Sequence, residues 1–470
     1  MSETKLYITS LFSQKKITVA TNRAHLFEAF LNDETNISAV KQIQQNQQAM
    51  LDKWELKNKI EDIINKQLMI PNATANKPYK AKIDFEKLGM GNIVFSDFEG
   101  LTEYGLKYDN SAEEIHGIPE KSGDFKIKMR FRVKDEAEDS VLNEKLVSLV
   151  INADPKSLWQ TKESNQHDPY WKPDDVSDFQ SLGKEKYMVV SSKRGRSHAN
   201  VGSFRDDDFS FKHYKEIGWS LVCVADGAGS AKLARQGSKL ACDAVVNYFG
   251  ENFSKALLKD FDETLLNYHH KTGEETEKKI SFFVYDNLSK AAHFAHKKIE
   301  EFANKLEVPL KDFHSTLIFA LFKKYDFGYA ILTFGVGDCP IGLLNKDLTE
   351  IKLMNWLDVG EFGGGTRFIT MPEIFSSDKF STRFGFKLIA DFSYLILMTD
   401  GIYDPKFVVE VNLEKIEKWK EFLIDLEGNN EEKIKVELKH DNKKIAEQLS
   451  AWMDFWSPGN HDDRTLAIVF

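Results

Sequence analysis

The spacing of apolar residues changes along the chain and predicts a different structure for each segment. Residues 1–76 are polar and rich in Gln, Asn and Lys, and their apolar residues from Ile43 to Ile64 recur at helical spacing. This spacing predicts one long amphipathic helix or a pair of helices. The Pro- and Asn-containing stretch "IPNATANKP" then ends the helical segment.

Residues 78–153 predict a small β domain. In "DFKIKMRFRV", apolar residues from Phe125 to Val133 alternate with Lys and Arg, as in a strand with one solvated face. Glycines and a proline mark turns before this strand. The order GL-x-Y-D, I-x-G-x-P and S-G-x-F resembles the immunoglobulin-like modules of many bacterial multidomain proteins. The resemblance implies a β-sandwich that serves as a spacer or a binding module, and a generic β-meander is the alternative.

The remaining residues predict a linker and then a larger domain. Residues 154–183 are polar, rich in Pro and Asp and without period, which is typical of a linker. From 184 to 470, short apolar runs such as "WSLVCVAD", "STLIFALFKK" and "TLAIVF" accompany two helical stretches at 231–249 and 277–306. Because the runs gather around two long helices and do not alternate strictly with helices, the pattern favours an α+β sandwich over a doubly wound sheet.

Aspartates stand at the ends of these apolar runs. One such residue is usually a turn former or a helix N-cap. Five sites of the same kind indicate more, because carboxylates that converge at the ends of strands repel each other unless a cation neutralises them. Oxygen ligands of this type suit magnesium and manganese, and no His/Cys set has zinc spacing. The five sites are Asp226, Asp338, Asp400, the pair Asp462–Asp463 and the run Asp206–Asp208.

Composition and charge narrow the classes of function. The chain has 470 residues and a formal net charge of −10, so its surface repels nucleic acid, and no block of Lys and Arg indicates a separate basic patch. No apolar run approaches the ~20 residues of a membrane span, and the first residues lack the layout of a signal peptide. The three cysteines match neither a metal pair nor a disulfide framework. We therefore expect a cytoplasmic protein that binds neither nucleic acid nor membranes.

Several motifs in order resemble the metal-dependent serine/threonine protein phosphatases, the type 2C or PPM family, and specifically a bacterial branch. The resemblance spans about 184–470 and implies an α-β-β-α sandwich with two central antiparallel sheets. The motifs are "SHANVGSFRDDDF", "VADGAGSAKLARQGSKLA", "HSTLIFAL", "GVGDCPIGLL", the flap-like "GEFGGGTRFIT", "LMTDGIYD" and "DDRTLAIV".

The resemblance assigns roles to the aspartates. It implies that Asp226 bridges two divalent ions, manganese or magnesium, and that the carbonyl of Gly227 binds one of them. Glycine at this position lets the backbone approach an ion or a bound phosphate. Asp400 and Asp462 are expected to ligate one metal, and Asp338 a third, weaker ion. Asp207 is expected to act in or next to the metal's ligand shell, with Asp206 beside it at the family's usual Glu position.

Two points of the first motif stay open. The three consecutive aspartates leave its register uncertain by one residue. Many members also carry an Arg a few residues before the first acidic pair to hold the substrate phosphate, whereas the corresponding positions 202 and 203 are Gly and Ser here. The candidates for this phosphate contact are His198, Arg194, Arg196 and Arg205.

The implied reaction is hydrolysis of phosphoserine or phosphothreonine in proteins by a water bridged between two ions, without a covalent enzyme intermediate. His198 or His461 could protonate the leaving oxygen. A cysteine-based phosphatase would need an Arg six positions after its nucleophile, and the chain has Gly229, Tyr248 and Asn345 there. That mechanism is therefore excluded.

Two other functions remain open at this point. The chain could be a noncatalytic scaffold or regulator that binds a partner through its N-terminal β-module, although retention of all five acidic sites favours activity. It could also act on a small phosphoester. We expect phosphorylated proteins as partners, and a cognate kinase is a further candidate.

Overall fold

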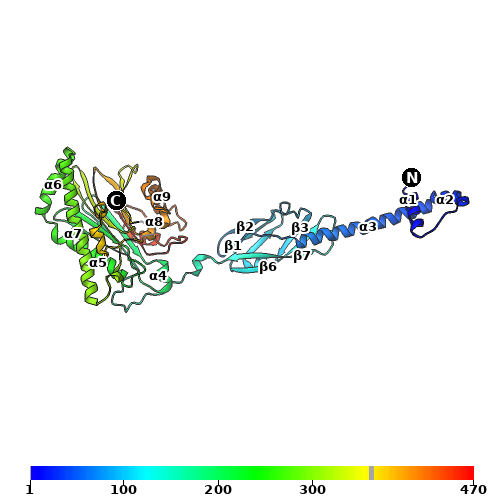
Figure 1. The fold of residues 1–470 in the computed structure, drawn as a ribbon, viewed down its shortest axis with the longest axis horizontal. Coiled ribbons are helices and arrows are strands. Elements are labelled where there is room, and N and C mark those ends of the chain that lie inside the picture. The colour runs from blue at the N-terminus through cyan, green and yellow to red at the C-terminus, as the bar shows by residue number, and fades with distance from the viewer. Residues whose placement is uncertain (1, 359–364) are drawn as a thin grey trace. The chain divides into compact units, whose positions relative to one another are not determined.

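The computed structural model describes residues 2–358 and 365–470 and divides the chain into two units, Met1–Leu158 and Trp159–Phe470 (Figure 1). All the predicted site residues belong to the second unit. Part of the flap-like motif, residues 359–364, lies outside the described residues.

The first unit begins with helices, as the apolar spacing predicts. They are α1 (Glu3–Gln14), α2 (Ala24–Leu31) and α3 (Glu34–Asn65). Ile8, Leu31 and Val40 form a small core between them. The C-terminal end of α3 buries Ile63 in the core of the β-module, but Trp54 in its middle is 63% exposed. The amphipathic pattern thus predicts the helix, but only parts of its apolar face are covered.

The β-module of the first unit consists of two small sheets. The order of the first is β1 (Ala73–Thr74), β7 (Asn143–Asn152), β6 (Gly123–Val133) and β3 (Ile93–Glu99). The order of the second is β2 (Tyr79–Lys82), β5 (Glu114–Gly117) and β4 (Leu106–Asp109). Strand β6 buries Ile127, Met129, Phe131 and Val133 in the core of the module. The predicted alternation is therefore correct, and the immunoglobulin-like identity of the module stays a prediction.

Two antiparallel sheets form the centre of the second unit. The order of the first is β10 (Asp208–Tyr214), β11 (Trp219–Ala225), β12 (Leu317–Tyr325), β13 (Gly328–Val336) and β16 (Phe384–Ile389). The order of the second is β15 (Ile351–Leu353), β14 (Ile341–Asn345), β17 (Phe392–Met398), β18 (Arg464–Val469), β9 (Tyr187–Lys193) and β8 (Asp175–Ser181).

Helices cover the outer face of each sheet (Figure 1). Those on the five-stranded sheet are α5 (Ala234–Asn252), α6 (Lys255–His270) and α7 (Glu274–Leu306). Those on the six-stranded sheet are α8 (Asp400–Phe407), α9 (Ile416–Leu426) and α10 (Ile445–Trp452). The predicted α-β-β-α sandwich is confirmed.

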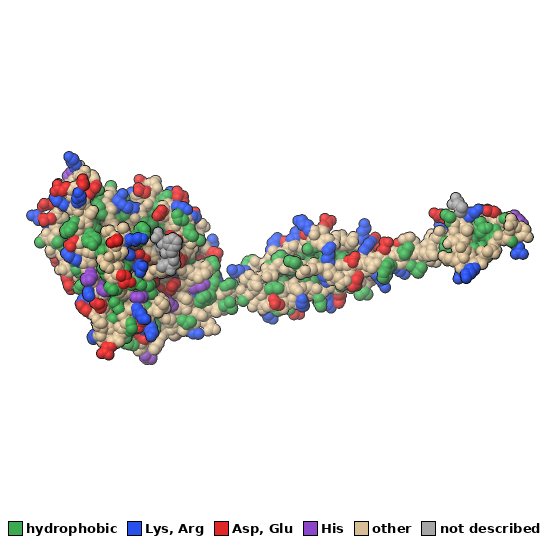
Figure 2. Space-filling view, in the orientation of Figure 1, with side chains coloured by type: hydrophobic (Ala, Val, Ile, Leu, Met, Phe, Trp, Pro, Cys, Tyr) green, Lys and Arg blue, Asp and Glu red, His purple; other side chains and the backbone are tan. Residues whose placement is uncertain are grey.

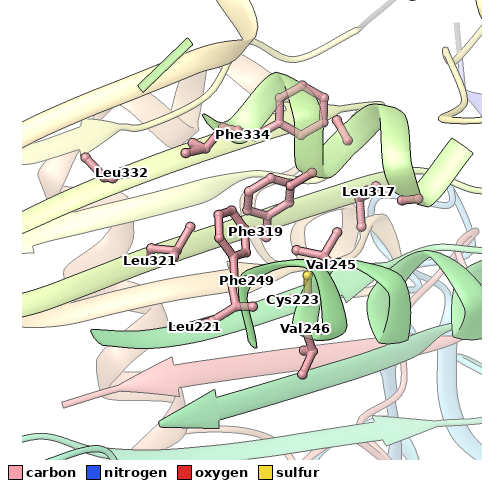
Figure 3. Packing of buried hydrophobic residues seen from close by; sticks show 14 of the residues in the cluster. Leu221, Cys223, Val245, Val246, Phe249, Leu317, Phe319, Leu321, Leu332 and Phe334 are labelled. Carbon is pink, nitrogen blue, oxygen red and sulfur yellow. The ribbon is translucent and has the colours of Figure 1, made fainter. Parts of the chain in front are cut away.

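The layered arrangement explains why the central strands are apolar throughout. Alternate residues of β11 point to opposite faces, and both faces are covered. Leu221 and Cys223 lie in the core under the helices, whereas Val222 and Val224 lie in the core between the sheets. On the helical side, Phe249 of α5 contacts Phe319 of β12 with ring centroids 5.9 Å apart (Figure 3).

The predicted linker, residues 154–183, is largely part of the second unit. Residues 175–181 form β8, the edge strand beside β9. As an edge strand it has a half-exposed burial pattern, and its polar sequence "DVSDFQS" therefore resembles a loop. Residues 159–174, which we call the strap, also belong to the second unit and contact the loop Asp206–Asp208, as shown below.

Lys and Arg side chains are interspersed with Asp and Glu over the visible face of the second unit (Figure 2). Within the described part of the chain, no helix is both long and apolar enough to cross a membrane. The three cysteines are buried and carry free thiols.

Candidate metal centre

The predicted acidic residues come from strand ends of both sheets. Asp226 directly follows β11, and Asp338 follows β13, in the five-stranded sheet. Asp400 begins α8 just after β17, and Asp462 comes shortly before β18, in the six-stranded sheet. The two sheets therefore bring carboxylates from distant parts of the sequence to one place.

The electrostatics of Asp226 show how close these groups lie. Burial raises the pKa of Asp226 well above its usual value, and four neighbouring carboxylates raise it further. In order of effect, these neighbours are Asp400, Asp207, Asp462 and Asp338. Ligand atoms of Asp226, Asp338 and Cys339 all lie within 4.8 Å of one another. The cluster carries mutual repulsion that a bound cation would relieve.

Asp400 has the features of a metal ligand. Its Oδ1 atom is buried without a hydrogen-bond partner among the described residues. Burial, followed by the charges of Asp338 and Asp462, raises its pKa to about 7. A buried carboxylate oxygen without a partner is costly, because it has lost water and gained no donor. The oxygen-rich set therefore fits a hard divalent ion, which prefers carboxylate ligands.

The glycines after two of the aspartates make room for other acidic segments. A Cβ on Gly227 would lie 2.5 Å from the carbonyl oxygen of Asp206, and one on Gly401 would lie even closer to the carbonyl oxygen of Asp463. Any larger residue would push these segments apart. The Asp-Gly pairs thus allow close approach between site segments, in addition to any approach to an ion.

The three consecutive aspartates have different environments. Asp207 is buried, and its Oδ2 accepts hydrogen bonds from the hydroxyls of Thr399 and Thr465, both at 2.8 Å. Asp208 instead pairs with Lys172 at 2.9 Å, and although burial opposes it, this ammonium lowers the pKa of Asp208. Burial and the charge of Asp463 raise the pKa of Asp206 to about 7. Asp206 and Asp207 therefore belong to the repelling cluster, and Asp208 does not.

Asp463 organises the site, although the motif comparison assigned it no role. It is 2% exposed and accepts hydrogen bonds from the backbone N–H groups of Gly195, Asp206 and Asp207. Its Oδ1 also lies 3.0 Å from Nδ1 of His198. These donors lower its pKa although burial opposes them. Asp463 therefore ties the first motif to the last strand.

His198, in α4 (Arg196–Val201), faces the cluster with its second nitrogen. Its Nε2 lies 3.9 Å from Oδ2 of Asp206 and 3.9 Å from Oδ1 of Asp462. Burial alone lowers the pKa of His198, but the hydrogen bond to Asp463 and the nearby acidic charges raise it to about 10. Since Nδ1 is taken by Asp463, the imidazolium points its Nε2–H toward the carboxylates.

The structure does not bring the predicted arginines to the cluster. Arg205 is 2% exposed, and its guanidinium donates to the carbonyls of Pro173 and Asp207 and to the hydroxyl of Ser192. The donors of Arg205 thus bind groups of the protein interior, and its contact with phosphate stays an untested prediction. Arg196 donates to the carbonyl of Asp454 and lies over the ring of Trp456.

Two further residues that the sequence suggested for the site, Arg194 and His461, lie outside the carboxylate cluster. Arg194 is buried, pairs with Asp174 at 2.9 Å and donates to the carbonyls of Ser203 and Lys162. His461 packs against the rings of Trp159 and Trp456 in tilted contacts, and burial lowers its pKa. Neither residue has a described contact with the carboxylate cluster.

A cavity of about 520 Å³ adjoins the cluster at Asp206. Its lining includes Asp168 of the strap, Phe204, Gly229, Lys232 and Arg235. Arg235 is buried and paired with Asp168 at 2.9 Å, whereas Lys232 is exposed. The cavity has the size of a ligand pocket and opens next to a predicted metal ligand.

Sequence reasoning missed several residues that support the cluster. Thr399 and Thr465 precede or follow site aspartates in "MTDG" and "DDRT", so their proximity to the site could have been suspected. Lys172 stands in the polar segment that predicts a linker, and nothing in its local sequence indicates a role. Its contact with Asp208 depends on the fold alone.

Comparison with known proteins identifies the family of the second unit. The sequence model of the protein phosphatase 2C family matches residues 194–453, more than half of the chain. The chain therefore belongs to the protein phosphatase 2C family, and the predicted class of enzyme, a phosphoprotein phosphatase, is confirmed at the level of this family. No curated protein matches the chain.

Solved structures with some similarity include two serine/threonine phosphatases and the protein RsbX. The catalytic domain of the serine/threonine protein phosphatase PstP, solved with two manganese ions, is 13% identical, with a TM-score of 0.37, and the match covers 60% of this chain and 97% of that one. Serine/threonine phosphatase Stp1 from Staphylococcus aureus is 14% identical, with a TM-score of 0.34 and coverage of 62% and 96%. RsbX, solved with magnesium, is 14% identical, with a TM-score of 0.33 and coverage of 63% and 98%.

Proposed function

We propose that this chain hydrolyses phosphoserine and phosphothreonine in proteins, using two divalent ions, manganese or magnesium, held at the carboxylate cluster. The observation that supports the proposal most is the convergence of four carboxylates on Asp226 from strand ends of both sheets. Such a cluster is stable only with compensating cations or with protons on some of its groups. A third, weaker ion at Asp338 belongs to the same proposal.

The proposed ligands follow from the environments of the aspartates. Asp226, Asp400 and Asp462 would hold the ions, with the Gly227 carbonyl as a further ligand, and Asp400 offers an oxygen that has no described protein partner. Asp206 and Asp207 would complete the acidic wall, with Asp207 oriented by two threonine hydroxyls. When bound, the ions would supply an activated water as nucleophile and neutralise charge on the phosphoryl oxygens.

His198 is the proposed contact for the substrate phosphate. Its Nδ1 is held by Asp463, which leaves Nε2–H as a donor beside Asp206 and Asp462. A charged donor at this place would stabilise negative charge that develops on the phosphoryl group. This role would compensate for the absence of an arginine at positions 202 and 203. The adjoining cavity would take residues that flank the phosphorylated side chain.

Release of phosphate from a phosphothreonine peptide tests the proposal. We expect turnover by the full chain with Mn²⁺, and a loss of at least about 1000-fold in Asp226→Asn, because the carboxylate in contact with most of the cluster is gone. Asp347→Asn serves as the matched control, since Asp347 is an exposed turn residue between β14 and β15. Its rate should equal that of the wild type.

Three outcomes would contradict the proposal. Equal rates for Asp226→Asn and Asp347→Asn would remove the cluster from the reaction. Binding of Mn²⁺ without any phosphate release from peptides or from p-nitrophenyl phosphate would favour the scaffold alternative. Activity on p-nitrophenyl phosphate alone would favour a small phosphoester. A cognate kinase as partner remains a prediction.

A further inference from the structure

The strap, residues 159–174, precedes the segment that matches the phosphatase family and lies against the loop of the first acidic motif. The loop in question is Asp206–Asp208, which leads into β10. The strap thus lies at the edge of the candidate metal centre, outside the segment that matches the family.

Lys172 is the strap residue in closest contact with this loop. Its side chain is about 10% exposed, and its Nζ donates to the carbonyl of Asp207 at 2.6 Å, to Oδ2 of Asp208 at 2.9 Å and to the carbonyl of Arg235 at 3.2 Å. A buried ammonium is costly unless its donors are satisfied. Here the loop and α5 supply the three acceptors, so Lys172 joins them.

The backbone of Asp207 is held from one side and its carboxylate from the other. Its carbonyl accepts from Lys172 and also from Nη1 of Arg205, at 2.8 Å. Nε of Arg205 donates in turn to the carbonyl of Pro173 in the strap. On the opposite side, two threonine hydroxyls from the six-stranded sheet hold the carboxylate. Asp207 is therefore held both at its backbone carbonyl and at its carboxylate.

Further ion pairs fasten the strap itself. Arg235 of α5 pairs with Asp168 at 2.9 Å and donates to the carbonyl of Tyr170 at 3.2 Å. Near the other end, Arg194 pairs with Asp174 at 2.9 Å. Cations of the phosphatase domain therefore hold the strap on both sides of Lys172, and the position of Lys172 is well defined.

We propose that Lys172 is a positioning residue for the metal centre: its ammonium holds the Asp206–Asp208 loop so that Asp206 and Asp207 face the ions. The proposal rests on the proposed function, because it requires that the cluster binds divalent ions. Contacts of this outer kind orient the ligands of a metal, and their loss typically weakens metal affinity about 10- to 100-fold.

The test measures Mn²⁺ affinity of the full chain by isothermal titration calorimetry. Lys172→Met alone would leave Asp208 buried without its partner, so the double variant Lys172→Met/Asp208→Asn removes both charges together. We expect the double variant to bind Mn²⁺ about 10- to 100-fold more weakly than the wild type. Unfolding by urea in EDTA shows whether it remains folded.

Lys186→Met provides the matched control. Lys186 is also a buried lysine, donates to the carbonyl of Phe392 at 2.6 Å and pairs with Asp391 at 3.3 Å. It stands before β9, whereas the predicted ligands of the six-stranded sheet lie after β17 and before β18. We expect Lys186→Met to change stability but to leave Mn²⁺ affinity as in the wild type.

Two results would overturn the positioning role. Wild-type Mn²⁺ affinity in a folded double variant would show that Lys172 serves stability only, while an active wild type would leave the proposed function intact. Equal losses of affinity in the double variant and in Lys186→Met would show a general effect of lost lysines. A wild type that binds no Mn²⁺ would overturn both proposals.

Discussion

The N-terminal β-module places carboxylates in exposed ion pairs, whereas the candidate metal centre buries carboxylates beside one another. In the module, Glu99 of β3 and Glu144 of β7 flank Arg130 of β6, with nearest contacts of 2.8 and 3.6 Å, and all three side chains are at least 40% exposed. At the metal centre, buried carboxylates face one another. Exposed cross-strand pairs stabilise a sheet modestly, whereas a buried like-charged cluster destabilises the metal-free fold.

Repulsion among buried carboxylates therefore destabilises the metal-free second unit, whereas the exposed carboxylates Glu99 and Glu144 of the first unit are paired with an arginine. Asp208 shows that the fold can neutralise a buried aspartate without a metal ion, because the ammonium of Lys172 pairs with it directly. No such partner is described for Oδ1 of Asp400, although the preceding residue, Thr399, donates its hydroxyl to Asp207. The unpaired oxygen of Asp400 is therefore a candidate ligand for the ions of the proposed function.

The largest expected effect is on the pH dependence of the metal-free protein. The folded-state pKa values of Asp206 and Asp400 are raised to about 7 from 3.8, so their ionised forms destabilise the fold. This destabilisation is complete above pH 7 and absent below about pH 4. Urea unfolding in EDTA should therefore show roughly 2–4 kcal/mol more stability at pH 5 than at pH 8. Saturating Mn²⁺ should reduce this difference, and a stability that falls from pH 8 to pH 5 would contradict the picture of a repelling cluster.

A smaller effect is expected from one member of the cluster. Asp400→Asn removes a buried charge that is repelled by Asp338 and Asp462. Metal-free Asp400→Asn should be about 1–3 kcal/mol more stable than the wild type at pH 8. The gain should be smaller at pH 5 and vanish below about pH 4, where the carboxyl is protonated in the unfolded chain as well. Asp347→Asn should show no gain at either pH. A destabilised Asp400→Asn would mean that the carboxylate is satisfied without an ion.

The smallest effect is expected in the β-module. Arg130→Ala removes both exposed ion pairs, and we expect a loss of about 0.2–1 kcal/mol in the unfolding free energy of the first unit, with part of it removed by 1 M salt. Phosphate release should be unchanged. A loss above about 3 kcal/mol would show that these pairs are not the weak surface pairs that their exposure indicates.

Local pattern was a good guide where one physical effect dominates. The alternation in β6, the apolar runs of β11 and β12 and the helical spacing of α3 each reflect burial of every second or every third to fourth residue. The pattern failed for β8, whose edge position leaves it too polar to distinguish from a linker. The apolar spacing also could not show that the middle of α3 stays exposed, because burial of a helix face depends on whether another element packs against it.

In the candidate site, too, local features could be predicted from the sequence and long-range contacts could not. The acidic residues could be named from the sequence because their chemistry and their places at strand ends are local features. Other features of the site could not be predicted, because each depends on residues that are distant in sequence. They are the different partners of Asp207 and Asp208, the hydrogen bonds of Asp463 and the burial of Arg205.

The sequence by itself determined the layers of the second unit, the acidic residues at its strand ends and the membership of the phosphatase family, because hydrophobic periodicity and residue type act locally. Only the tertiary structure decided which carboxylates repel one another, which are paired and that Lys172 contacts the Asp206–Asp208 loop. Electrostatic interactions depend on distance and burial, and both are set by which strand ends the two sheets bring together.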